Sequence, residues 1–197
     1  GGQAPGGSRG LSDIPLFAGV GVMGGAMFRD FAIVATAFGA DVRALQGAGA
    51  VGALSIVVGV LLSFVIGAVV AVSFGYTDPI AVTTIGAGAA TYIVGPVTGT
   101  ALGASSEIIA LSVAAGLTKS VLVMIGTPFV ASRIGLNNPH SALIYGGLMG
   151  TTSGVAGGLA ATDPKLVPYG AMTATFYTGA GCLLAPSILY IVVDMLV

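Results

Sequence analysis

Long apolar runs, separated by isolated charges, make up most of the chain. Residues 44–77, 79–106 and 166–193 contain no charged side chain, and 134–162 is interrupted only by His140. Each run exceeds the roughly 20 residues that a helix needs to cross the hydrocarbon core of a bilayer. Two less uniform runs, 14–40 and 107–134, contain Arg29-Asp30 and Lys119. The pattern predicts an all-α, polytopic transmembrane helix bundle of about six spans: 14–39, 48–75, 79–103, 107–134, 139–162 and 167–196.

Three prolines mark the expected starts of helices. Asp78-Pro79, Asn138-Pro139 and Asp163-Pro164 each place a side chain that can cap a helix directly before a proline. An Asp or Asn oxygen accepts a hydrogen bond from a free N–H group of the first helical turn. Proline at the first helical position costs no hydrogen bond, because an N–H group there would have no partner within the helix. We therefore expect a helix N-terminus at each of these dipeptides.

The composition agrees with a chain surrounded by lipid. Hydrophobic residues make up 55% of it and charged residues 7%, whereas soluble domains carry about 25% charged residues. The 33 glycines allow helices to pack closely in a membrane. A net charge of −1 provides no basic surface for a nucleic acid. The single cysteine, Cys182, lies in an apolar run and is expected to be a small core residue.

Two segments are unsuited to plain lipid-facing helices. VTTIGAGAATYIVGPVTGT (82–100) and GGLMGTTSGVAGGLAAT (146–162) both combine Gly with Thr or Ser, and the first has Gly95-Pro96 near its middle. Proline within a helix frees a carbonyl, and broken backbone at membrane depth is tolerated only where it is buried in protein or lines a cavity. We predict discontinuous helices here. Their N-termini would suit an anion, and their freed carbonyls would suit Na⁺.

Tight packing is the alternative interpretation of both segments, because small residues at helix interfaces need no ligand. In 150–154, three adjacent hydroxyls flanked by glycines exceed what packing requires, so a binding site is favoured there. In 83–84 and 98–100, packing and a binding site explain the residues equally well.

Charged residues within the spans are further candidates, because burying a charge in lipid is costly. Arg29-Asp30 fits an ion pair within the bundle, a loop between half-helices, or part of a site. Lys119 lies near the middle of its span and would more easily face a polar cavity than extend to the interface. Glu107 and Asp163 lie near span ends, where helix capping is the simplest of several roles.

A weak internal repeat has an offset of 60 residues. AVVAVSFGYTDP (68–79) aligns with PFVASRIGLNNP (128–139), and beyond them Thr91 falls on Thr151. Transporters often contain such repeats, with binding sites at the repeat interface. In a chain so rich in Gly, Ala and Val, chance similarity is the competing explanation.

Three long strings resemble the MadM subunit family of bacterial malonate:sodium symporters. They are SRGLSDIPLFAGVGVMGGAMFRDFAIVATAFG (8–39), TTIGAGAATYIVGPVTG (83–99) and GGLMGTTSGVAGGLAATDPKLVPYGAMTATFYTGAGCLL (146–184). The resemblance extends over essentially the whole chain. It implies uptake of malonate coupled to Na⁺, a smaller membrane subunit, MadL, as partner, and a multi-pass location in the bacterial inner membrane.

The chain departs from that family at its start. Residues 1–10 are Gly-rich and polar and predict a loop, without the features of a signal peptide. We expect this loop to lead into one transmembrane domain, 1–197, that lacks the family's N-terminal hydrophobic region.

The candidate residues follow from what a dianionic substrate and Na⁺ require. Malonate needs helix N-termini, hydroxyls and a cation, whereas Na⁺ prefers oxygen ligands. The candidate substrate-binding residues are Thr83, Thr84, Thr98, Gly99, Thr100, Gly150, Thr151, Thr152, Ser153, Gly154, Lys119 and Arg29. The candidate Na⁺-coupling residues are Asp30, Gly95, Glu107 and Asp163.

Other function classes fit the sequence less well. The chain has no Ser-His-Asp arrangement, Cys/His cluster or Walker-type loop, so we expect neither a self-contained enzyme nor a cofactor beyond the co-transported Na⁺. The alternative is a membrane subunit of a Na⁺-pumping decarboxylase complex. That class predicts a carboxylate deep within a broken helix, whereas Asp78, Glu107 and Asp163 lie near span ends.

Overall fold

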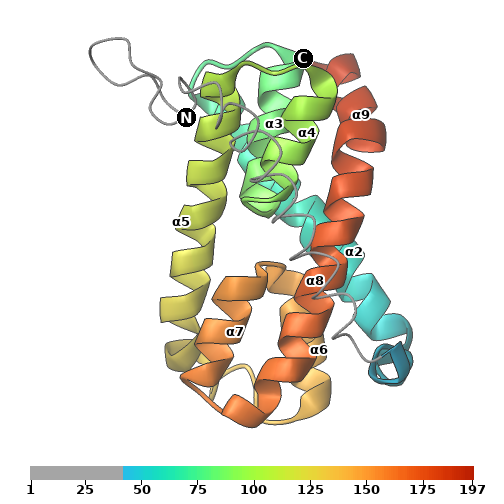
Figure 1. Cartoon of the computed structure of the whole chain (residues 1–197), viewed down its shortest axis with the longest axis vertical. Helices are drawn as coiled ribbons and strands as arrows, with labels where there is room; N and C mark the ends of the chain where they lie inside the picture. Colours follow the sequence, from blue (N-terminus) through green and yellow to red (C-terminus); the bar gives the residue numbers. More distant parts are fainter. Residues whose placement is uncertain (1–41) are drawn as a thin grey trace, which may run out of the picture. The chain divides into compact units, whose positions relative to one another are not determined.

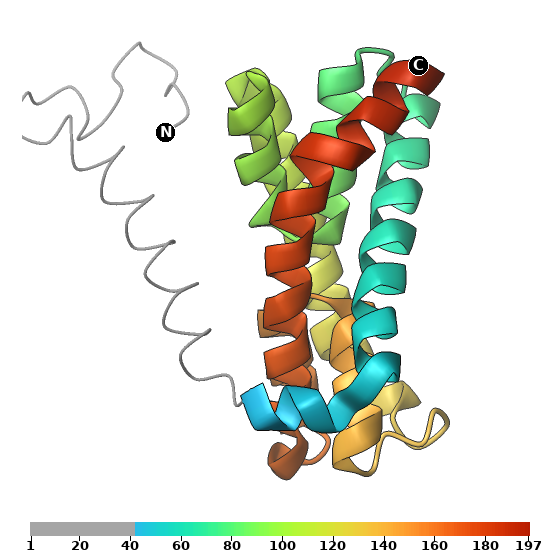
Figure 2. The same cartoon turned by 90° about the vertical axis from the view of Figure 1, so that its right-hand side faces the viewer.

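The computed structural model describes residues 42–197, which belong to one compact unit, Asp41–Val197, and are entirely helical apart from short connections (Figure 1). The first helix described is α2, Val42–Ser73, which kinks at Gly49, where φ is 60°. Before this kink the chain runs across the axis of the rest of α2 (Figure 2). The expected span 14–39, with Arg29 and Asp30, lies outside the described residues.

Three long apolar helical stretches form the frame of this unit. They are Gly49–Ser73 within α2, Ser106–Val130, which is α5, and the continuous stretch Pro164–Leu196. The last comprises η3 (Pro164–Leu166), α8 (Val167–Leu184), a π-helical turn η4 (Ala185–Leu189) that includes Pro186, and α9 (Tyr190–Leu196). All three are long and apolar enough to cross a membrane. They confirm helices at three of the expected spans: 48–75, 107–134 and 167–196.

The two Gly/Thr segments are interrupted helices, as the sequence predicts. The first consists of α3 (Pro79–Ala90) and α4 (Val94–Leu102), separated at Thr91, whose backbone is extended (φ −152°, ψ 155°). The second consists of α6 (Pro139–Met149) and α7 (Thr152–Ala160). There the break combines a left-handed Gly150 (φ 70°) with an extended Thr151 (φ −94°, ψ 107°).

The position predicted for the first break was wrong by a few residues. Pro96 lies in the first turn of α4 and does not interrupt it. The first N–H groups of a helix have no partner within it, so proline costs no hydrogen bond at this position. The chain breaks before it, at 91–93.

Each interrupted helix turns back on itself instead of continuing across. A Cβ on Gly95 would lie 2.8 Å from the Cα of Gly88, and one on Gly99 would lie 2.8 Å from Cγ2 of Thr84. This register makes α3 and α4 antiparallel. The expectation that 79–103 and 139–162 are spans with a break is therefore corrected in one respect. Each is broken, but it forms a pair of short antiparallel helices, which we call the first and the second hairpin.

The two helices of the second hairpin also run in opposite directions, as their contacts with α8 show. Gly146 packs against Gly170, and Gly150 packs against Tyr177, so α6 runs parallel to α8. Leu159 and Val155 of α7 also pack against Gly170. Leu159 lies near the end of α7 and contacts the start of α8, so α7 points the opposite way to α6.

The side chains predicted to start helices do so. The Asp78 carboxylate accepts a hydrogen bond of 2.8 Å from Ala81 N, and Asn138 forms a reciprocal capping box with Ser141. Asp163 accepts a hydrogen bond of 3.0 Å from Lys165 N and caps η3. Each cap satisfies free N–H groups at the point where the chain begins a new helix.

The two hairpins share a pattern of burial at the predicted offset of 60 residues. The buried positions Thr91, Val94, Gly95, Thr98 and Gly99 correspond to Thr151, Gly154, Val155, Gly158 and Leu159. Figure 1 shows the first hairpin beside one end of α5 and the second beside the other, with their tips facing each other. Repeated elements inserted from opposite ends are the arrangement of many secondary transporters.

Glycines bring the hairpins against the long helices. Gly88 packs on the backbone of Ser112, Gly116 on the backbone of Tyr92, and Gly154 on the backbone of Ser120. In lipid, where apolar burial between helices gains little, such close backbone approach is a main source of helix association. These contacts hold both hairpin tips against the middle of α5.

Candidate functional site

Lys119, near the middle of α5, extends its ammonium group to three other helices. Its Nζ donates hydrogen bonds to Ser63 Oγ of α2 (2.9 Å), to the carbonyl of Ala90 at the end of α3 (2.9 Å) and to Tyr177 Oη of α8 (3.3 Å). It also lies 5.1 Å from the centroid of the Tyr177 ring, within range of a cation–π contact. The cation is therefore positioned at the tip of the first hairpin.

All three hydrogen-bond partners of this ammonium group are uncharged. Ala90 O is one of the free carbonyls at the C-terminus of α3, so the cation compensates the negative end of that helix. Within residues 42–197 no carboxylate is close enough to form an ion pair with Lys119. An intramembrane cation without a counter-ion favours the binding of an anion.

Four hydroxyl groups, including that of Ser120, which follows Lys119 in α5, join the two hairpin tips. Ser120 Oγ lies 2.7 Å from Thr151 Oγ1 and 2.8 Å from Ser153 Oγ. Ser153 Oγ in turn lies 3.3 Å from Tyr92 Oη, at the tip of the first hairpin. Thr151 is buried, whereas Ser153 is exposed and Tyr92 partly exposed, so this hydroxyl cluster can be reached from outside the protein.

The N-termini of α4 and α7 differ in one respect that matters for an anion. Thr91 Oγ1 accepts hydrogen bonds from Ile93 N (3.2 Å) and Val94 N (3.1 Å) and so caps α4. Thr151 Oγ1 is hydrogen-bonded to Ser120 and makes no cap for α7. The first N–H groups of α7 thus remain without a side-chain acceptor, beside the exposed hydroxyl of Ser153.

Tyr177 links the long helices to the tip of the second hairpin. Its hydroxyl donates a hydrogen bond of 3.1 Å to the carbonyl of Gly59 in α2 and accepts one from Lys119. Gly150 lies directly against its ring, where a Cβ would overlap the aromatic carbons. The fully buried ring therefore supports both Lys119 and the break at Gly150.

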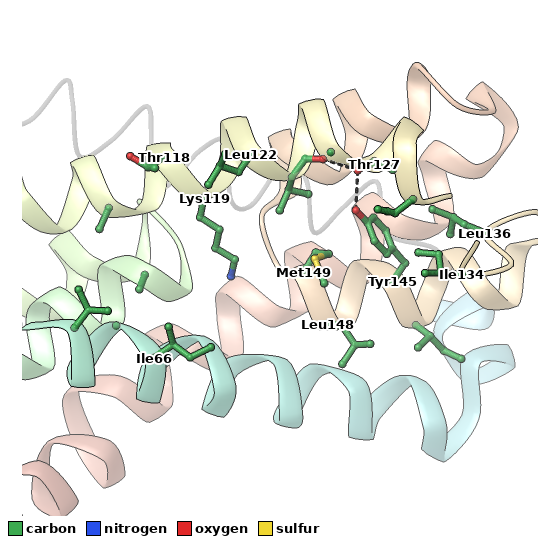
Figure 3. Close-up of a pocket in the computed structure, with 18 of the residues that line it drawn as sticks. Ile66, Thr118, Lys119, Leu122, Thr127, Ile134, Leu136, Tyr145, Leu148 and Met149 are labelled. Atoms are coloured by element: carbon green, nitrogen blue, oxygen red, sulfur yellow. Dashed lines mark hydrogen bonds between the residues drawn. The ribbon is translucent and has the colours of Figure 1, made fainter. Parts of the chain in front are cut away.

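Lys119 is also one of the residues that line a cavity of about 1050 Å³ (Figure 3). Its wall comes from α2, α3, α5 and α6 and consists mainly of apolar side chains such as Ile66, Leu122 and Leu148. The hydroxyl cluster of Ser120, Thr151 and Ser153 does not line it. A small dianion would find one cation and few other donors here, so we place the site at the hairpin tips instead.

The structure brings together part of the predicted residue set. Thr151 and Ser153 meet at Ser120, and Lys119 reaches the end of α3 at the tip of the first hairpin. Gly150 forms the break in the second hairpin, and Gly154 packs on Ser120. Thr152, the first residue of α7, is partly exposed beside them.

Other predicted residues lie away from this meeting point. Thr83, Thr84, Thr98 and Gly99 are buried further along the first hairpin, and Thr100 is exposed near the end of α4. Gly95 contacts Ser112 and Gly88 within regular helix, so it provides no broken backbone for an ion.

Two of the predicted Na⁺ ligands occupy helix ends. Glu107 is exposed in the first turn of α5, and the Asp163 carboxylate accepts a hydrogen bond as the cap of η3. Both lie more than two helical turns along the chain from Ser120 or Ser153. Neither therefore belongs to the hairpin tips, and a role of either in binding Na⁺ stays a prediction.

Sequence reasoning missed Ser63, Tyr92, Ser120 and Tyr177. Single hydroxyl residues within apolar spans have no distinctive spacing, and they become recognisable only when the fold brings them together. One signal was present: Tyr92 directly follows Thr91, which the repeat aligns with Thr151.

Comparison with known proteins gives one match. The family model of the malonate/sodium symporter MadM subunit matches residues 1–197. No curated protein and no solved structure matches the chain.

Proposed function

This chain belongs to the MadM subunit family of malonate/sodium symporters, and from that premise we propose that it binds malonate where its two hairpin tips meet and moves it inward with Na⁺. The setting we propose is the bacterial inner membrane. The family name describes one subunit of a transporter of several components. We propose a smaller, MadL-like membrane protein as the other subunit.

The observation that carries this proposal is the ammonium group of Lys119, which has no counter-ion in residues 49–197 and contacts Tyr177. Gly150, two residues before the uncapped start of α7, packs on the same tyrosine ring. A carboxylate of malonate can accept hydrogen bonds from this cation, and the other from first-turn N–H groups of α7 and the Ser153 hydroxyl. A site that offers positive charge to both carboxylates matches a dianion better than a neutral solute.

Charge balance explains the need for Na⁺. Moving each negative charge inward against a negative interior costs about 2.3 kcal/mol per 100 mV. Two Na⁺ ions would cancel the charge of one malonate dianion, and a third would make inward transport electrically favourable. The coupling ion therefore supplies the driving force that the substrate's own charge opposes.

Uptake into proteoliposomes that contain the complete complex tests the proposal. We expect radiolabelled malonate to accumulate only when a Na⁺ gradient is directed inward, and an inside-negative potential to increase the rate. Replacement of Na⁺ by K⁺ at equal ionic strength is the control. Uptake that does not depend on the Na⁺ gradient would contradict the proposed coupling to Na⁺. Uptake of succinate in preference to malonate would contradict malonate as the substrate.

Removing the hydroxyls of Thr151 and Ser153 together is expected to raise the KM for malonate about tenfold or more, because two polar contacts of about 0.5–1.5 kcal/mol each are lost. The double variant Thr151→Ala, Ser153→Ala should still assemble, since Gly150 and Tyr177 hold the break. Thr100→Ala, in the exposed part of α4, is the matched control and should leave the KM unchanged. An unaltered KM in the double variant would remove these hydroxyls from the site.

A further inference from the structure

Three hydroxyl groups in the first hairpin are buried without a hydrogen-bond partner. They belong to Thr83 and Thr84 of α3 and Thr98 of α4, and all three side chains are 0% exposed. A buried hydroxyl that makes no hydrogen bond loses its solvation without compensation, which costs about 1–3 kcal/mol. Three such groups in one pair of short helices require an explanation.

The remaining buried hydroxyls show that the fold can satisfy such groups. Thr127 and Thr178 donate to the carbonyls of Val123 and Ala174, one turn back in their own helices, and Ser112 donates to Ile109 O. This local bond is open to most threonines in a helix. Every buried Ser or Thr in residues 49–197 has a partner of some kind except these three. The exceptions are therefore confined to the first hairpin.

Because α3 and α4 are antiparallel, Thr84 of α3 and Thr98 of α4 lie at a similar distance from the hairpin tip. Gly99 packs on Cγ2 of Thr84, and Thr98 directly precedes Gly99 in α4. Thr83 is next to Thr84 in α3. The group lies about two helical turns, or roughly 10 Å, from the hairpin tip. It is therefore separate from Lys119 and from the hydroxyls at the tip.

The second hairpin shows that the architecture does not need these hydroxyls. At the offset of 60 residues, Leu143, Ile144 and Gly158 take the places of the three threonines. None of these carries a polar side chain, and yet the second hairpin is also interrupted at the matching threonine, Thr151, and the start of α7 repeats the burial pattern of α4. The hydroxyls are therefore specific to the first hairpin.

We propose that Thr83, Thr84 and Thr98 provide side-chain ligands for a coupling Na⁺ ion within the first hairpin. This inference rests on the proposed function, which requires Na⁺, and adds the location of the ion. Na⁺ is a hard cation that binds neutral hydroxyl and carbonyl oxygens, and such oxygens are what this buried position offers. The ion would provide the interaction that each hydroxyl lacks. Binding of Na⁺ here and of malonate at the tip would then involve the same pair of helices.

The Na⁺ dependence of the double variant Thr84→Val, Thr98→Val tests this inference. Valine has nearly the shape of threonine without its oxygen, so packing is preserved. In proteoliposomes containing the complete complex, we expect the Na⁺ concentration for half-maximal malonate uptake to rise at least about tenfold, which corresponds to the loss of a strong polar contact. At saturating Na⁺, the KM for malonate should stay within about twofold.

A second readout does not depend on transport. The unaltered complex should gain thermal stability when NaCl replaces KCl, because a ligand that binds only the folded state stabilises it. The double variant should melt at the same or a higher temperature in KCl and should lose this Na⁺-dependent gain. Thr178→Val is the matched control: its hydroxyl is also buried but is bonded to its own helix, so the Na⁺ response should persist.

The outcomes separate this inference from the proposed function. If the unaltered complex depends on Na⁺ and the double variant keeps the same half-maximal concentration and the same thermal gain, the threonine site is wrong and the proposed function stands. If uptake by the unaltered complex ignores Na⁺, both are wrong. Should the double variant fail to assemble, Thr98→Ser and Thr98→Val are compared singly, and equal Na⁺ dependence in the two would overturn the site.

Discussion

Replacing Lys119 by methionine is expected to reduce malonate uptake to near background while the complex still assembles. Methionine retains most of the length and apolar volume of the lysine stem but removes the only cation at the hairpin tips in residues 49–197. Loss of a charge-assisted contact of about 1.5–3 kcal/mol corresponds to a loss of about 10- to 150-fold in affinity. The carbonyl of Ala90 would also lose the group that caps α3.

The same substitution at Lys165 provides the control. Lys165 is exposed in η3, at the outer end of the second hairpin, and no contact joins its side chain to the hairpin tips. Lys165→Met should therefore transport malonate at the normal rate. The readouts are malonate binding to the purified complex by calorimetry and uptake into proteoliposomes. Full affinity in Lys119→Met would show that the substrate does not use this cation.

Replacing Gly150 by alanine is expected to prevent stable folding of the second hairpin. The residue has φ of 70°, a conformation that costs an L-residue roughly 1–2 kcal/mol. The added Cβ would also overlap the ring of Tyr177, which is fully buried and tied to Gly59. Because the backbone and the ring both resist movement, we expect the free energy of unfolding to fall by several kcal/mol in total. Little monodisperse protein should then be obtained in detergent.

Gly179→Ala is the matched control for this loss. Gly179 lies in α8, and a Cβ there would meet no atom within 4 Å. Alanine should be tolerated or slightly stabilising, since glycine within a helix is less favourable by about 0.8–1 kcal/mol. The measurement is the melting temperature of each purified variant and its yield after size-exclusion chromatography. If the Gly150→Ala variant has the same melting temperature as the unaltered protein, the break does not have the described geometry.

The presence of both breaks and of the helix caps, though not the position of the first break, was predictable because local chemistry determines it. Asp78-Pro79 and Asn138-Pro139 start helices through short-range hydrogen bonds, and Gly150-Thr151 ends one through a left-handed glycine. Each signal lies within a few residues of its effect. The same is true of Lys119, whose charge in the middle of an apolar span indicated a polar environment before any fold was known.

The course of the chain after each break was not predictable from local signals. A segment of about 25 residues can cross the membrane as one helix or enter it and return as two, and both use the same apolar residues. The difference depends on long-range contacts, such as Gly88 with Ser112 and Gly146 with Gly170. For that reason the sequence predicted the interruption of both segments but not that each turns back on itself.

The site was predictable in part for a similar reason. Thr151 and Ser153 stood out as adjacent hydroxyls between glycines, whereas Ser120 and Tyr92 are single polar residues in otherwise apolar sequence. Their role depends on the two tips meeting at α5, which no local pattern encodes. Thr100, by contrast, belongs to the Thr98-Gly99-Thr100 motif but is exposed near the end of α4.

A cryo-electron microscopy map of the complete complex, determined with and without malonate, tests the central claim most directly. Our account predicts additional density between Lys119 Nζ and the N-terminus of α7 in the malonate map, within hydrogen-bonding distance of Ser153. Substrate density elsewhere, or a Lys119 ammonium group paired with a carboxylate of the protein while malonate is bound, would contradict it.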